Sequence, residues 1–233
     1  MSEKRFELFN GDCLEVMQDL IDDGVKVDLI VTDPPYLMNY KTNYMKDKSH
    51  DFCKPIANDT NFELIKDIMP LLFELLKEGG AVYMFCNANH IDYFKQQIEQ
   101  HFKLKNILIW IKNNWSAGDL KGAYAKQTEF ILFANKGRHL LNGARDTDTL
   151  YYNRVVGNMQ LHQNQKPVDL LAFLINKSSK PNDTILDCFM GSGSTGVACL
   201  ETNRNFIGIE LEPKYYEIAK KRINEAKAQR RLI

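Results

Sequence analysis

The apolar residues of this 233-residue chain alternate between short runs typical of strands and longer runs with helical spacing. Such alternation is the signature of a mainly parallel sheet with helices on both faces. Strands are expected at 6–9, 27–31, 81–86, 107–111, 129–134, 184–187 and 206–210. Helices are expected at 13–21, 62–76, 91–101, 167–175, 194–201 and 215–228. We therefore predict an α/β fold with a seven-stranded, mostly parallel sheet.

Two features depart from the simple alternation. The strands 107–111 and 129–134 have no helical pattern between them, which predicts an antiparallel hairpin at the edge of the sheet. Two regions, about 37–61 and 113–165, are polar with scattered aromatic residues, apart from the strand 129–134 that lies within the second region. Loops this long in a compact α/β domain are usually functional lids or binding loops, or disordered. The length favours a single domain over residues 1–233.

Composition excludes several classes of protein. No apolar run approaches the roughly 20 residues that a membrane span needs, and no signal-peptide stretch follows Met1, so we expect a cytoplasmic protein without a membrane partner. The five cysteines lack a Cys-x-x-Cys pair, which predicts reduced thiols and no metal. Net charge is zero, but residues 106–145 hold six bases against two acids, so one face could contact a polyanion.

The run Asp33-Pro34-Pro35-Tyr36 follows the strand predicted at 27–31. Proline fixes φ and lacks an N–H group, so the chain leaves the sheet in a stiff turn with free carbonyls. A carboxylate, free carbonyls and an aromatic ring suit a planar base that carries an exocyclic amine. Taken alone, the run is more typical of a proline turn that closes a strand.

A second candidate site begins at Asp187, where the strand 184–187 leads into the turn Phe189-Met190-Gly191-Ser192-Gly193 and a helix. Glycines let a turn approach a ligand closely, and the helix directs N–H groups at it. Glu210 ends the next strand, 23 residues after Asp187, where an acid typically accepts from ribose hydroxyls. The turn matches neither the dinucleotide nor the phosphate-loop pattern. A nucleoside cofactor without phosphates fits better.

The two motifs, in this order, resemble those of the S-adenosylmethionine-dependent DNA amino-methyltransferases of the permuted β class. Gly11-Asp12-Cys13 resembles the adenine contact of that class, and residues 162–167, His-Gln-Asn-Gln-Lys-Pro, resemble its His-Pro-Thr-Gln-Lys-Pro motif with Gln163 and Asn164 substituted. The resemblance covers about residues 8 to 222. It implies a Rossmann-like methyltransferase fold, one catalytic domain, S-adenosylmethionine as cofactor, double-stranded DNA as partner, and a restriction-modification context.

The resemblance also implies roles for individual residues. The catalytic motif is Asp33, Pro34, Pro35 and Tyr36: Asp33 and the Pro34 carbonyl would accept from the amine, and Tyr36 would stack on a flipped-out base. Asp12 would accept from the cofactor adenine, although it equally suits a helix N-cap. Lys166 would neutralise the cofactor carboxylate. The predicted cofactor-binding residues are Asp12, Cys13, Asp33, Lys166, Asp187, Phe189, Gly191, Ser192, Gly193, Thr195 and Glu210.

Asp at the first motif position is commoner in adenine-N6 enzymes of this family, so Asp33 favours adenine. Cytosine-N4 methylation is the alternative, and an RNA or protein-glutamine methyltransferase or a non-catalytic nucleotide-binding module is a weaker one. β-class relatives are often dimers, so a homodimer is also considered. Aromatic and basic residues of the two irregular regions are predicted DNA contacts: Tyr40, Trp115, Lys121, Tyr124, Lys126, Arg138 and Arg145.

Overall fold

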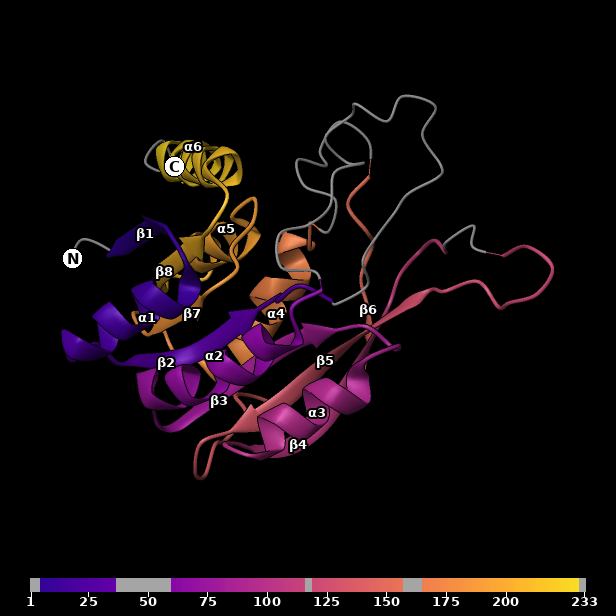
Figure 1. The fold of residues 1–233 in the computed structure, drawn as a ribbon. Helices are drawn as coiled ribbons and strands as arrows, with labels where there is room; N and C mark the ends of the chain where they lie inside the picture. Colours follow the sequence, from indigo (N-terminus) through magenta and orange to yellow (C-terminus); the bar gives the residue numbers. More distant parts are fainter. Residues whose placement is uncertain (1–4, 37–59, 116–118, 157–164, 231–233) are drawn as a thin grey trace.

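The computed structural model describes residues 5–36, 60–115, 119–156 and 165–230, which form one sheet covered by helices (Figure 1). The strands are β1 (Phe6–Asn10), β2 (Val27–Thr32), β3 (Leu76–Cys86), β4 (Lys103–Ile111), β5 (Thr128–Asn135), β6 (Thr149–Tyr151), β7 (Thr184–Asp187) and β8 (Asn205–Glu210). The helices are α1 (Cys13–Asp22), α2 (Phe62–Leu75), α3 (Ile91–Glu99), α4 (Val168–Ser178), α5 (Ser194–Glu201) and α6 (Pro213–Arg230).

The strand order is β1-β8-β7-β2-β3-β5-β4-β6. Every neighbouring pair is parallel except those that include β5, which runs antiparallel to both β3 and β4. The α/β class, the mostly parallel sheet and the antiparallel β4–β5 pairing are therefore confirmed.

The predicted strand count is wrong, because the described residues contain eight strands and not seven. The additional strand, β6, lies beyond β4, so the β4–β5 hairpin is not at the edge of the sheet. β6 has only three residues, too few to show a periodic pattern. It is stabilised by tertiary contacts: Leu150 is buried, and the indole N–H of Trp110 on β4 donates to the carbonyl of Tyr152 at 2.8 Å.

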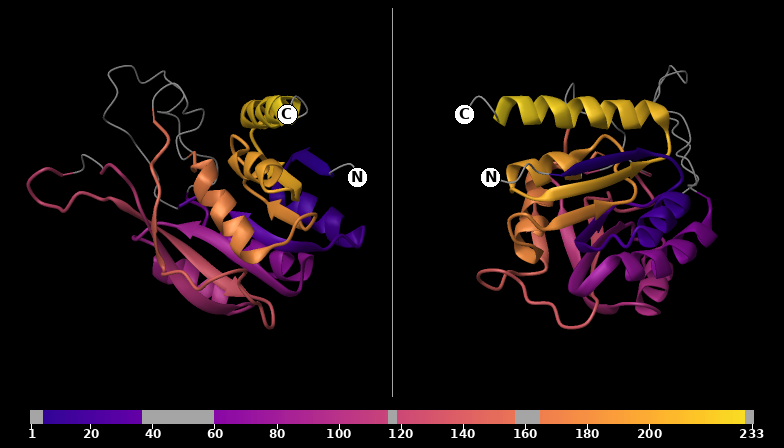
Figure 2. Two further views of the ribbon diagram at one scale, coloured as in Figure 1. Left: turned by 180° about the vertical axis from the view of Figure 1, so that it is seen from behind. Right: turned by 90° about the vertical axis from the view of Figure 1, so that its left-hand side faces the viewer.

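The helices form two layers, one on each face of the sheet (Figure 2). Helices α1, α2 and α3 pack against one face, and α4, α5 and α6 pack against the other. Side chains of β2 alternate between the two layers: Ile30 joins the first, whereas Leu29 and Val31 join the second. All three are fully buried, as expected for a central parallel strand.

The topology gathers several strand ends at one side of the sheet. Because β2, β7 and β8 are parallel, their carboxyl ends place Asp33, Asp187 and Glu210 along the same edge. This edge is the row of strand ends, and it is distinct from the outer strands β1 and β6. Since β5 runs in the opposite direction, its amino end, with Glu129, reaches that edge as well. Ligands of open α/β sheets bind at this edge.

Candidate active site

The Asp33–Tyr36 turn lies directly after β2 and is braced by β3. The side-chain amide of Asn87, just past β3, donates to the carbonyl of Tyr36 at 2.9 Å. Oδ2 of Asp33 accepts from Nζ of Lys166 at 2.5 Å, whereas its buried Oδ1 has no hydrogen-bond partner within the described residues. A buried acceptor is costly to leave unpaired. Oδ1 is therefore suited to accept from a bound ligand.

Lys166 is the centre of a buried group of charges. Its Nζ contacts Asp33, the hydroxyl of Tyr36 at 2.9 Å, and Oε2 of Glu129 at 3.4 Å. Burial opposes the charged form of Lys166, but Asp33 and Glu129 outweigh it and raise its pKa. Burial raises the pKa of Asp33, although Lys166 acts in the opposite direction. Lys166 thus directs its charge at the Asp33–Tyr36 turn in this structure, and its predicted contact with the cofactor carboxylate stays a prediction.

Glu129 is a site residue that our sequence analysis did not predict. It accepts from the hydroxyl of Tyr36 at 3.1 Å and pairs with Nζ of Lys112 at 2.5 Å. Burial opposes its ionisation, but Lys166 and Lys112 outweigh burial and lower the pKa of Glu129 to about 2. The available signal was an acid at the start of an otherwise apolar strand, since charged residues are rarely buried unless paired.

The turn after β7 is built around Asp187. Its Oδ2 accepts from the hydroxyl of Thr195 at 2.6 Å, and its Oδ1 accepts from the backbone N–H of Phe189 and the hydroxyl of Thr32, both at 3.1 Å. Burial raises the pKa of Asp187 to about 7, against the effect of these hydrogen bonds. Asp187 therefore holds the turn in place through hydrogen bonds to both ends of it.

The glycines of the turn are required by its backbone. Gly193 has φ of 77°, and a Cβ atom there would lie 3.0 Å from the Cβ atom of Ala219 on α6. Gly191 also has a positive φ. Ser192 is buried, and Nη1 of Arg222 on α6 donates to its carbonyl at 3.2 Å. Ser192 and Thr195 thus bond within the protein and support the turn.

Two acids lie side by side at the neighbouring ends of β1 and β8. Glu210 accepts from the backbone N–H of Gly191 at 2.9 Å, which connects β8 to the turn. The backbone N–H of Gly11 donates to the carbonyl of Glu210 at 3.1 Å. Asp12 is the next residue after Gly11, so its backbone lies close to Glu210. Asp12 is also the N-cap of α1, accepting from the N–H of Leu14 at 2.8 Å. Acceptors beside a glycine turn fit the adenine and ribose of a nucleoside cofactor.

Cys13, the residue after Asp12, is buried at the start of α1. Burial raises its pKa to about 12, so the thiol is neutral. Any contact with the cofactor would therefore be apolar or through the backbone.

Four of the predicted DNA contacts lie near this edge of the sheet, in the connection between β4 and β5. Trp115 is 66% exposed and Tyr124 fully exposed, and both Lys121 and Lys126 are exposed. Leu120, which we did not predict, is 84% exposed in the same connection. Tyr40 lies outside the described residues.

Arg138 and Arg145 are placed elsewhere. They follow β5, whose carboxyl end lies at the opposite edge of the sheet because this strand is antiparallel to β3. Asn142, between them, donates its backbone N–H to the carbonyl of Lys177 at 2.7 Å, near the end of α4. The structure therefore does not bring these two arginines to the candidate active site, contrary to our grouping of them with Lys121 and Lys126.

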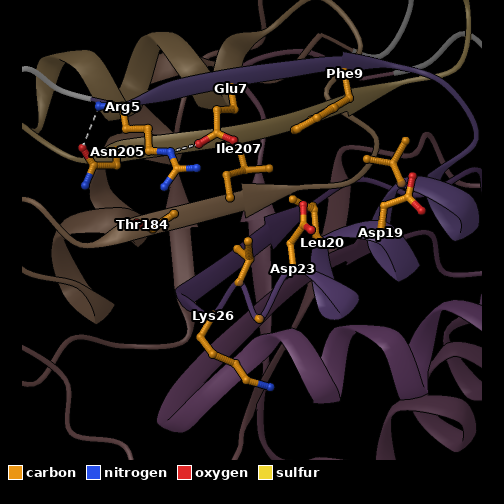
Figure 3. Close-up of a pocket in the computed structure, with 13 residues that line it drawn as sticks. Arg5, Glu7, Phe9, Asp19, Leu20, Asp23, Lys26, Thr184, Asn205 and Ile207 are labelled. Atoms are coloured by element: carbon orange, nitrogen blue, oxygen red, sulfur yellow. Dashed lines mark hydrogen bonds and ion pairs between the residues drawn. The ribbon is translucent and has the colours of Figure 1, made fainter.

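A cavity of about 540 Å³ also lies away from the site, between β1, α1 and the starts of β7 and β8 (Figure 3). Arg5 and Glu7 pair at its rim, and Thr184 and Asn205 mark the amino ends of the strands. The cavity contains none of the predicted site residues. It is a separate feature of the molecule.

Comparison with known proteins decides the family. Residues 27–221 match the model of the N6/N4 methyltransferase family described as DNA methylase. The chain belongs to the DNA methylase family. The methylase is therefore an S-adenosylmethionine-dependent DNA methyltransferase, as the paired motifs predicted.

Individual relatives agree with this assignment. The methylase is 27% identical to the type II methyltransferase M2.MboI of Moraxella bovis, over 96% of this chain and 89% of the relative. It is 24% identical to the DNA adenine methyltransferase YhdJ of Escherichia coli, over 94% and 83% of the two chains. The crystal structure of the M1.HpyAVI–SAM complex covers 94% of the methylase and 99% of its own chain, with 32% identity and a TM-score of 0.74. The predicted cofactor and fold are confirmed.

Two further findings concern the described residues only. None of their helices is long and apolar enough to cross a membrane. They contain no group of three or more His, Cys, Asp or Glu residues arranged to hold a metal ion.

Proposed function

We propose that the methylase transfers the methyl group of S-adenosylmethionine to the exocyclic N6 amine of adenine at specific sites in double-stranded DNA. The observation that carries the proposal is the buried Oδ1 of Asp33, which has no partner among the residues that the structure describes and lies beside a fixed Tyr36. An Asp at this motif position and the relative named as a DNA adenine methyltransferase both favour adenine over the cytosine-N4 alternative.

The chemistry asked of Asp33 is to change the shape of a poor nucleophile. The lone pair of an exocyclic amine is delocalised into the ring of the base. When Oδ1 of Asp33 and the carbonyl of Pro34 accept its two N–H bonds, the nitrogen is drawn towards a tetrahedral form with its lone pair directed at the methyl donor. When bound, the cofactor supplies an already activated methyl group: its S–C bond breaks as the N–C bond forms, a neutral thioether leaves, and the methylated nitrogen loses its extra proton. Tyr36 stacks on the base, which must be flipped out of the duplex to reach the site.

The cofactor lies, in this proposal, over the carboxyl ends of β1, β8 and β7. Asp12 accepts from the adenine and Glu210 from the ribose, while the turn from Phe189 to Gly193 lies under the methionine part. Asp12 lies two residues past the end of β1, and Asn10, the last residue of β1, pairs with Glu210 on β8, which supports this arrangement. Lys166, which contacts Asp33 at 2.5 Å, also neutralises the cofactor carboxylate in this proposal.

DNA is held by the connection between β4 and β5 and by the irregular region about 37–61, within one catalytic domain over residues 1–233. The exposed Trp115, Lys121, Tyr124 and Lys126 support this part of the proposal. The proposal also includes association into a homodimer. It further includes a cytoplasmic location, which the absence of long apolar runs from the sequence supports.

A labelled-methyl assay tests the substrate directly. The protein is incubated with labelled S-adenosylmethionine and two sets of duplex oligonucleotides. In one set adenine provides the only acceptor amine, and in the other set cytosine provides it. Label on the adenine duplexes alone is expected. Label on cytosine alone would overturn the adenine assignment, and label on neither would overturn the proposed function. Sequencing modified bases in DNA from cells that express the protein identifies the site.

A further inference from the structure

We propose that Glu129, neutralised by Lys112, is a positioning residue that holds Lys166 and Tyr36 in the geometry needed for methyl transfer. This inference rests on the proposed function, because it assigns a role in the same reaction. Glu129 and Lys112 do not belong to the motifs that identify the family in this chain.

The first support is the geometry of the charges, which alternate in sign from one contact to the next. Asp33 contacts Lys166 at 2.5 Å, Lys166 contacts Glu129 at 3.4 Å, and Glu129 contacts Lys112 at 2.5 Å. Their side chains are at most 20% exposed. Two acids and two bases make the group neutral overall. A buried charge is strongly destabilising when its partner is removed, so each member depends on the next.

The second support is the orientation of Tyr36. Its hydroxyl accepts from Nζ of Lys166 at 2.9 Å and donates to Oε2 of Glu129 at 3.1 Å. A phenol has one proton to donate, so these two contacts fix both the direction of the O–H bond and the plane of the ring. Glu129 thus determines how the ring lies against a stacked base.

The third support is electrostatic. Glu129 competes with Asp33 for the charge of Lys166, because both carboxylates contact the same ammonium group. If Glu129 were neutral, Lys166 would act on Asp33 alone and the group would carry a net positive charge. Positive charge also develops on the amine nitrogen as it takes up the methyl group. A net positive site would therefore raise the energy of the transition state relative to the bound substrate.

The variant Glu129→Gln tests the inference, because it keeps the size of the side chain and an acceptor for Tyr36 but removes the charge. We expect kcat to fall roughly 10- to 100-fold. We expect the affinity for S-adenosylmethionine to remain close to that of the wild-type protein, and the melting temperature to fall, because Lys112 loses the charge of its buried partner. Glu129→Asp, which restores the charge, should recover part of the rate. Glu99→Gln is the matched control, since it removes the same charge from an exposed ion pair with Lys95, and it should leave kcat unchanged.

A double-mutant cycle asks whether the two residues act as one unit. The loss from Glu129→Gln should be smaller when Lys112 is already replaced by Met, because neighbours in one network are not additive. Full additivity would overturn the shared role.

The outcomes separate this inference from the proposed function. A wild-type protein that methylates DNA and a Glu129→Gln variant with unchanged kcat would overturn the inference alone. A loss of cofactor binding in proportion to the loss of kcat would reduce Glu129 to a structural role and also overturn it. If the wild-type protein transfers no methyl group, the proposed function fails, and a crystal structure of Glu129→Gln decides the positioning: displaced Tyr36 and Lys166 support it, and unchanged side chains overturn it.

Discussion

Nζ of Lys166 lies 2.5 Å from Oδ2 of Asp33, although the two residues are 133 positions apart in the sequence. The contact joins a residue just before α4 to the turn after β2, which carries the Asp-Pro-Pro-Tyr motif. It occupies one carboxylate oxygen of Asp33 and leaves Oδ1 without a partner among the described residues. Oδ2 thus binds Lys166, and Oδ1 remains available for the substrate amine, which is the basis of the first prediction.

Replacement of Asp33 by Ala is expected to abolish methyl transfer while leaving cofactor binding largely intact. The change removes Oδ1, the acceptor for the amine, and a preorganised polar group of this kind is worth about 100-fold or more in rate. Label transfer measures the first effect, and calorimetric titration with S-adenosylmethionine measures the second. An equal loss of both would indicate that Asp33 is structural.

Replacement of Gly193 by Ala should destabilise the protein more than the same change at Gly24. Both glycines have positive φ, which costs a residue with a Cβ atom about 1–2 kcal/mol. Only Gly193 also lacks space, because its new Cβ atom would press on Ala219, whereas nothing lies within 4 Å at Gly24. Overpacking adds about 1–3 kcal/mol. Urea denaturation measures both variants, and equal losses would contradict the close approach of the turn to α6.

The ionisation of Asp187 should make stability depend on pH. Its pKa is raised by burial from 3.8 to about 7. Between these values the folded protein binds the proton and the unfolded chain does not, so this group's contribution to the free energy of unfolding falls as pH rises. Asp187→Asn cannot ionise. The difference in the free energy of unfolding between wild type and this variant should shift, from pH 4 to pH 8, in favour of the variant. A difference that stays constant would show that Asp187 is ionised throughout this range.

Salt dependence of DNA binding should distinguish the two ends of the sheet. A variant with both Lys121 and Lys126 replaced by Ala should show a log-affinity against log-salt slope that is shallower by about 1 for each phosphate that a lysine no longer neutralises. The matched variant with Arg138 and Arg145 replaced by Ala removes the same charge at the opposite edge of the sheet, and its slope should equal that of the wild type. The reverse result would place the DNA on the other edge.

Much of the fold could be predicted because its strands and helices are long enough to repeat their apolar pattern. Helix α5 was predicted with its observed bounds, 194–201, and the strand at 184–187 likewise. β6 could not be predicted, since three residues show no period and the strand exists through its pairing with β4. β3 is five residues longer than expected, because Leu76 pairs with Val27 before a shift in register.

The candidate site divides in the same way. By itself, the sequence determined the α/β class, the two motifs and the family they indicate, because each motif is a local run whose backbone geometry depends on its own glycines and prolines. Only the tertiary structure decided that Glu129 and Lys112 join Lys166 beside Asp33, and that Arg138 and Arg145 do not. The physical reason is strand direction: an antiparallel β5 carries its first residues to the active edge and its last residues away from it, and pairing partners far apart in the chain set that direction.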